Sequence, residues 1–172
     1  RTRPDFEAPR VMTRLAERAS HRVSIRSLHR RDLAQEAETM RRIFDDAWAN
    51  NWGFAPLDPA GWAETVSTLA KLLPEDYIQF AEVDGEPVAF IVALPNLIEA
   101  ARDLDGRLLR FGCLRFLWRL KVSGVASARV PLMGVTQAYQ HSRLGPTVAF
   151  MIIDAVRRAL HGRGVTEVEM GW

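Results

Sequence analysis

Residues 128–161, ARVPLMGVTQAYQHSRLGPTVAFMIIDAVRRALH, decide the fold of this chain. The apolar start of the stretch predicts a strand over 128–136. Pro146, followed by apolar residues at helical spacing, predicts a helix over 146–161. The N–H groups in the first turn of a helix lack intrahelical partners, so the loop before such a helix is a general device for holding a phosphate. The stretch therefore predicts an anion-binding loop between a strand and a helix.

Hydrophobic periodicity predicts the elements on either side of this stretch. Asp84-Gly85 between two apolar runs is a strong hairpin signal, and the second run is apolar nearly throughout, as in a strand covered on both faces. In chain order we expect a helix at 9–20 with Val11, Leu15 and Ala19 on one side, a strand at 22–28, helices at 31–49 and 58–72, strands at 77–83 and 87–94, a helical insertion at 95–121, and, after the decisive stretch, a strand at 165–172. This order predicts one α/β domain over 22–172, preceded by a linker helix within 1–21.

Composition limits the function classes. A chain of 172 residues with 48% hydrophobic content suits a single domain with a real core. The net charge of +2 is too small to predict a nucleic-acid partner. The single Cys113 excludes an internal disulfide, and the four histidines have no spacing suited to a metal. No apolar run is long enough for a membrane span and no signal peptide is visible, so we expect a cytoplasmic protein with neither a nucleic-acid nor a membrane partner.

The strand, loop and helix of 128–161 resemble the acyl-CoA-binding motif of the GCN5-related N-acetyltransferase (GNAT) family. Between its strand and helix that family has Arg or Gln, two residues, Gly, one residue, and Gly or Ala. Gln140 and Gly145 match the first and last positions, whereas Arg143 replaces the first Gly. The resemblance implies an α/β fold with a mixed, mostly antiparallel sheet flanked by helices. In the family a further helix and two strands follow, so we expect the fold to be incomplete at the C-terminus.

Three other stretches, residues 45–54, 83–100 and 106–121, are similar to an uncharacterised bacterial subgroup of GNAT-like proteins. In that subgroup a domain of this kind follows another GNAT-like lobe. The last predicted strand, 165–172, has one apolar face and would leave an exposed edge at the end of the chain. We therefore expect a functional unit that is longer at both ends and that packs against another GNAT-like lobe or a second copy of itself.

The resemblance further implies that acetyl-CoA or a related acyl-CoA binds as co-substrate, without a metal. The pantetheine arm is expected along the main chain of the strand and the pyrophosphate at the loop amides. The implied cofactor-binding residues are Met133, Val135, Thr136, Gln140, His141, Ser142, Arg143, Leu144 and Gly145. The side chain of Arg143 either pairs with a phosphate or reshapes the pocket that a glycine would leave open.

The implied function is transfer of acetyl from acetyl-CoA to a small amine or amino-acid-like acceptor. The alternative is a non-catalytic GNAT-like scaffold or an acyl-CoA-binding lobe of a larger protein. Direct transfer needs a base, a donor for the oxyanion and an acid. No catalytic residue is assigned, because the family's acid, a Tyr, lies on the helix after the last strand; Glu167 and Glu169 are either candidate bases or exposed strand carboxylates. The loop 50–54 either contacts the acceptor or simply ends a helix.

Two basic stretches also leave alternatives open. Arg10, Arg14 and Arg18 form either a solvated stripe or a partner-binding one. Residues 107–121 carry five basic residues among Leu, Phe and Trp, which suits either a membrane interface or a helix that closes the substrate side of the cleft. Cys113, within this second stretch, is either a buried inert thiol or one with a lowered pKa.

Overall fold

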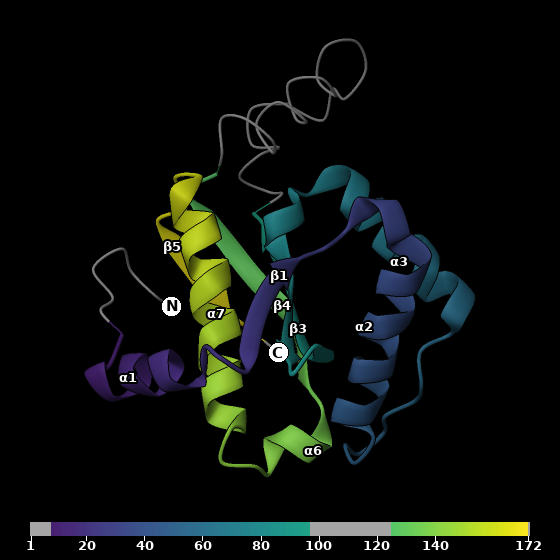
Figure 1. The fold of residues 1–172 in the computed structure, drawn as a ribbon. Coiled ribbons are helices and arrows are strands. Elements are labelled where there is room, and N and C mark those ends of the chain that lie inside the picture. The colour runs from purple at the N-terminus through teal and green to yellow at the C-terminus, as the bar shows by residue number, and fades with distance from the viewer. Residues whose placement is uncertain (1–7, 97–124, 172) are drawn as a thin grey trace.

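The computed structural model describes residues 8–96 and 125–171 (Figure 1). The expected insertion at 95–121 lies outside the described residues except for Pro95, which ends a strand, and Asn96. Cys113 and the basic stretch 107–121 lie outside them as well. The described elements are α1 (Arg10–Ala19), β1 (Val23–Ser27), η1 (Arg30–Asp32), α2 (Leu33–Trp48), α3 (Pro59–Leu72), η2 (Glu75–Tyr77), β2 (Ile78–Val83), β3 (Glu86–Pro95), β4 (Ser127–Val135), α6 (Gln137–Gln140), α7 (Gly145–Gly162) and β5 (Glu167–Met170).

The sheet has the order β1-β2-β3-β4-β5. The first three pairings are antiparallel and the β4–β5 pairing is parallel, so the sheet is mixed and mostly antiparallel, as expected. The predicted hairpin joins β2 to β3, with Asp84 (φ 53°) and Gly85 (φ 87°) both in the left-handed region. The last strand begins at Glu167, two residues later than expected, because Val165 and Thr166 precede its parallel pairing with β4; of the expected range, Trp172 lies outside the described residues.

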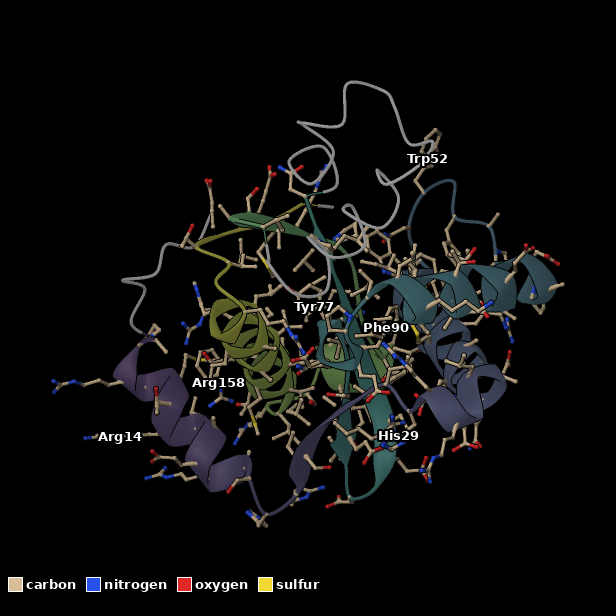
Figure 2. The ribbon with its side chains drawn as sticks, turned by 90° about the horizontal axis from the view of Figure 1, so that it is seen from above. Arg14, His29, Trp52, Tyr77, Phe90 and Arg158 are labelled. Carbon is tan, nitrogen blue, oxygen red and sulfur yellow. The ribbon has the colours of Figure 1, made fainter. Side chains whose placement is uncertain are left out.

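Helices cover both faces of the sheet. The helices α2 and α3 lie on one side and α7, with α1 against it, on the other (Figure 1). This explains why β3 is buried continuously from Val88 to Ala93. Figure 2 shows Tyr77 and Phe90 between these layers, whereas Arg14 and Trp52 project away from the core.

The helix α1 does not bury the side that its sequence pattern suggests. Only Ala19 of that side is buried, whereas Val11 and Leu15 are 69% and 40% exposed. Met12, one residue along from Val11, instead faces an apolar pocket against α7 and β5. In a helix of only ten residues the apolar spacing does not determine which side is buried. The packing of α1 against α7 determines that side instead.

Two helices position the functional region. In α7, Val148, Ile152, Val156 and Leu160 recur every four residues and are buried, which fixes the helix on the sheet. In α2, close approach to β4 depends on Gly134. A Cβ at Gly134 would lie 3.0 Å from the Phe90 ring and 3.5 Å from the Cβ of Ala47. The end of α2 therefore rests directly on the backbone of β4.

Candidate functional site

The strands β4 and β5 are paired only over the first half of β4. Their pairing runs from Ser127↔Glu167 to Val130↔Met170 and then ends. The next residue, Pro131, has no N–H to continue a ladder. From there to Val135, β4 keeps β3 on one side and, within the described ranges, has no strand on the other. We call residues 131–135 the free edge of β4.

The register determines which backbone groups the free edge presents. The N–H of Thr136 donates to the carbonyl of Val88 at 2.9 Å, so the polar groups of Thr136, and of Gly134 two residues before it, face β3. Backbone direction alternates along an antiparallel strand. The N–H and C=O groups of Met133 and Val135 therefore point away from β3, toward the free edge.

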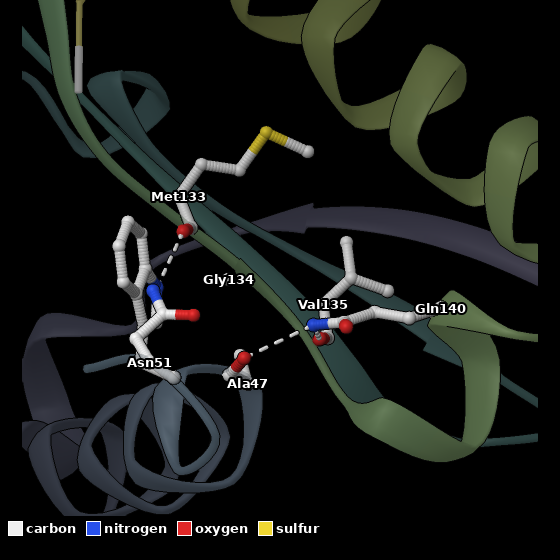
Figure 3. Close-up of a pocket in the computed structure, with 7 residues that line it drawn as sticks. Ala47, Asn51, Met133, Gly134, Val135 and Gln140 are labelled. Atoms are coloured by element: carbon white, nitrogen blue, oxygen red, sulfur yellow. Dashed lines mark hydrogen bonds between the residues drawn. The ribbon is translucent and has the colours of Figure 1, made fainter. Parts of the chain in front are cut away.

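A pocket of about 330 Å³ lies between this edge and the end of α2 (Figure 3). Its lining residues are Ala47, Trp48, Asn51, Met133, Gly134, Val135 and Gln140. None of these side chains titrates, so the lining offers hydrogen bonds and apolar surface but no charge. Its volume is at the lower end of the range for small-molecule sites.

The carbonyls of Met133 and Val135 each accept a hydrogen bond from a side chain. The indole Nε1–H of Trp48 donates to the carbonyl of Met133 at 3.3 Å. The amide Nε2 of Gln140 donates to the carbonyl of Val135 at 2.7 Å and to that of Ala47 at 3.2 Å (Figure 3). One lone pair of each carbonyl is therefore engaged, and the N–H groups of Met133 and Val135 lie on the same side of the strand.

Hydrogen bonds between side chains and backbone fasten the end of α2 to α6. The carboxylate of Asp46 accepts from the backbone N–H of Gln137 at 2.7 Å, and the Gln137 side-chain amide donates to the carbonyl of Asp46 at 2.7 Å. The amide of Asn50 donates to Gln137 Oε1 at 3.1 Å. One of these bonds is accepted by a carbonyl in the last turn of α2, and together they hold one wall of the pocket in place.

The loop from α6 to α7 holds itself together through Ser142. Its Oγ accepts from the N–H groups of Leu144 (3.2 Å) and Gly145 (3.1 Å), and it donates to the carbonyl of Tyr139 (2.9 Å). A Cβ at Gly145 would lie 2.1 Å from the Tyr139 carbonyl oxygen, so only glycine fits there. Arg143 is exposed at the tip of this loop.

The structure brings the predicted cofactor-binding residues into one region. Met133 and Val135 lie at the end of β4 and Thr136 follows it. Gln140 lines the pocket, residues 141–144 form the loop before α7, and Gly145 begins that helix. The short helix α6 was not predicted, because four residues carry no periodic signal. Glu167 and Glu169, the possible bases, lie on β5 and do not line the pocket.

Sequence reasoning missed Ala47 and Trp48 as pocket residues. Phe44 and Trp48 lie one helical turn apart, and their rings stack with centroids 5.7 Å apart, so together they resemble an ordinary core face. The adjacent loop, which does include Asn51, also exposes Trp52 completely. In the described ranges, no group of three His, Cys, Asp or Glu is arranged to hold a metal, and no helix is long and apolar enough to cross a bilayer.

Comparison with solved structures identifies the fold. A possible acetyltransferase from Clostridium difficile 630 superposes with a TM-score of 0.54 at 14% identity, covering 88% of this chain and 80% of that one. An aminoglycoside N-acetyltransferase solved in complex with CoA superposes with a TM-score of 0.51 at 15% identity, covering 87% and 76%. The chain has the fold of the GNAT acetyltransferases. The expected fold class is thereby confirmed.

Two curated proteins are similar in sequence over most of this GNAT-fold chain. Protein YghO from Escherichia coli K12 is 44% identical over 170 residues, which are 99% of this chain and 44% of that protein. Bacterial ceramide synthase from Caulobacter vibrioides is 40% identical over 150 residues, 87% of this chain and 39% of that protein. The chain thus spans less than half the length of either relative. No family model matches it.

Proposed function

We propose that this chain is the acyl-CoA-binding part of an N-acyltransferase, which moves acetyl or a related acyl group from a CoA thioester to an amine. The observation that carries the proposal is the end of the β4–β5 pairing at Val130. Beyond this residue the N–H groups of Met133 and Val135 are directed to a pocket. The same strand leads through α6 and a short loop into α7. An extended ligand can join such an edge as an additional strand does, through its backbone-like amides.

The loop before α7 is the proposed site for the pyrophosphate. The positive end of the α7 macrodipole favours an anion there. Part of the expected amide cradle is already engaged, since Ser142 Oγ accepts from Leu144 and Gly145. We propose that the exposed Arg143 contributes a charged contact to phosphate in place of the glycine that the family motif has at this position.

In this arrangement the reaction is a direct attack. The neutral amine attacks the thioester carbon, and the N–H groups of the free edge stabilise the oxyanion. The C–S bond then breaks, the nitrogen loses a proton to become the amide, and the CoA thiolate takes up a proton to leave as the thiol. Because no residue in the pocket lining titrates, we assign no base or acid among those residues. Asn51 and Trp52 lie on the loop beside the pocket, where we place the entry of the acceptor.

An amine acceptor has support from sequence as well as from fold. A ceramide is the amide of a long-chain amino alcohol, and one relative at 40% identity is named a bacterial ceramide synthase. We therefore propose two acceptor classes for direct comparison: small amines or amino-acid-like molecules, and long-chain amino alcohols. We also propose that the domain works against another GNAT-like lobe or a second copy of itself, in a cytoplasmic protein.

Titration calorimetry and thermal shift with acetyl-CoA and a long-chain acyl-CoA test the binding proposal. Saturable heat and a rise in melting temperature are expected. Absence of both at millimolar ligand would refute it. Thiol release, measured with each acceptor class in turn, then tests catalysis.

A non-catalytic lobe is the second candidate, and the uncharged pocket lining favours it. Such a lobe binds acyl-CoA but releases no thiol with either acceptor class. An enzyme binds acyl-CoA and releases thiol with one of the two classes. The same pair of measurements therefore separates the two candidates.

A further inference from the structure

The free edge of β4 is unusual in what it offers to a ligand. An open strand edge ordinarily presents both N–H donors and C=O acceptors. Here the two carbonyls that face the pocket accept from Trp48 and Gln140, whereas the N–H groups beside them face the pocket. We infer that Trp48 is a positioning residue that engages the Met133 carbonyl, and so favours binding of the carbonyl oxygen of an acyl thioester at the neighbouring N–H. This inference rests on the proposed function.

The chain direction places the acyl group at Met133. The loop 141–145, proposed for the pyrophosphate, follows the Val135 end of the free edge. A ligand that starts in this loop and runs along the edge passes Val135 first and reaches Met133 next, close to the point where β5 departs after Val130. The thioester at the far end of the pantetheine arm therefore lies nearer to Met133 than to Val135.

Capping the Met133 carbonyl matters because the acyl oxygen becomes negative during transfer. An uncapped carbonyl oxygen next to that atom repels it, whereas the neighbouring N–H attracts it. The Trp48 indole engages the Met133 oxygen at 3.3 Å and reduces this repulsion. The residue acts through the backbone of Met133 rather than on the substrate itself.

The indole is held in position by its surroundings. Its ring stacks on Phe44, with an interplanar angle of 26°. The bonds between Asp46 and Gln137 fix the end of α2, and Gly134 lets this helix lie close to β4. Trp48 is thus presented to the Met133 carbonyl by a packed helix rather than by a loop.

Trp62 provides a matched control. Its indole Nε1–H also donates to a backbone carbonyl, that of Ala37 at 2.9 Å, and its ring also stacks on Phe44 with centroids 6.3 Å apart. It does not line the pocket. Trp48→Phe and Trp62→Phe therefore remove the same kind of hydrogen bond and the same kind of ring, but only the first removes it from the free edge.

The experiment measures the Kd of CoA and of acetyl-CoA by calorimetry for the wild type, W48F and W62F. The ratio of the two values isolates the acetyl group, since the contacts of the CoA portion that the two ligands share cancel. We expect the wild type to bind acetyl-CoA more tightly than CoA. In W48F the ratio of the two Kd values should fall by roughly two- to tenfold, which corresponds to the free energy of one hydrogen bond. W62F should keep the wild-type ratio.

Two results would overturn the inference while leaving the proposed function intact: an unchanged ratio in W48F, or an equal change in W62F. No binding of either ligand by any of the three proteins would refute the proposed function and the inference together. If W48F does not fold, indole ¹⁵N–¹H spectra of the wild type decide the question. The Trp48 signal should move more with acetyl-CoA than with CoA and the Trp62 signal should stay fixed; equal movement of the Trp48 signal with both ligands would overturn the inference.

Discussion

Removing the guanidinium of Arg26 should destabilise the fold strongly. Arg26 on β1 bridges two carboxylates, with Nη1 at 2.8 Å from Glu36 Oε1 and Nε at 2.5 Å from Glu82 Oε1. Its guanidinium carbon also lies 4.4 Å from the centre of the Phe80 ring. Glu36 is only 5% exposed, so Arg26→Met leaves a buried carboxylate without its main partner. Methionine keeps the aliphatic packing, which makes the change chiefly electrostatic.

The magnitude follows from burial. Breaking a fully buried ion pair costs about 3–5 kcal/mol. The side chains of Arg26 and Glu82 keep 23% and 20% exposure, and His29 Nδ1 lies 3.5 Å from Glu36 as a weaker partner, so we expect the lower end of that range. A loss of about 3 kcal/mol lowers the melting temperature of a chain of this size by roughly 6–12 °C.

Urea denaturation of three variants provides the test. Arg22, just before β1, pairs with Asp84 in the turn after β2, but both side chains are at least half exposed, so Arg22→Ala should cost much less than Arg26→Met. Adding Glu36→Gln to Arg26→Met removes the orphaned charge and should restore part of the loss. If R26M costs no more than R22A, the reasoning from burial is wrong.

Two further predictions concern the loop and the hairpin. Gly145→Ala should lower the free energy of unfolding by about 1–3 kcal/mol in urea and weaken acyl-CoA binding in calorimetry, because its Cβ meets the Tyr139 carbonyl. The Arg22 guanidinium lowers the pKa of Asp84 through a hydrogen bond and charge attraction. A lowered folded-state pKa contributes stability above the unfolded value, and this contribution is lost as pH falls through the folded value. An NMR titration should therefore show the pKa of Asp84 rising in Arg22→Ala.

The fold was predictable from sequence because its longest elements carry clear local signals. The Asp84-Gly85 turn and the four-residue repeat of α7 each identify their element without tertiary information. The helix α1 has no comparable local signal for its buried side, and Val11 and Leu15 are exposed. In a helix so short, the partner surface rather than the pattern selects the buried side.

The candidate site was predictable only along β4 and its loop. Met133 and Gln140 belong to one continuous motif, whereas Trp48 reaches the Met133 carbonyl across 85 residues of sequence. That contact depends on the strand register, which sets the direction of the carbonyl, and on the space that Gly134 leaves for α2. Neither condition has a local sequence signal, so a pair such as Phe44 and Trp48 is indistinguishable from core packing until the strands are aligned.

An uncharged pocket lining also constrains how an acyl transfer at this site depends on pH. The amine must lose a proton before it attacks, and none of the lining side chains from Ala47 to Gln140 titrates to take it up. If deprotonation occurs in solution, kcat/KM should rise with pH and level off at the acceptor's own ammonium pKa. Two acceptors whose pKa values differ by about two units should then give profiles displaced by the same amount, about two pH units. Profiles that inflect at one common pH would instead reveal a protein base that acts on the pocket from beyond its lining.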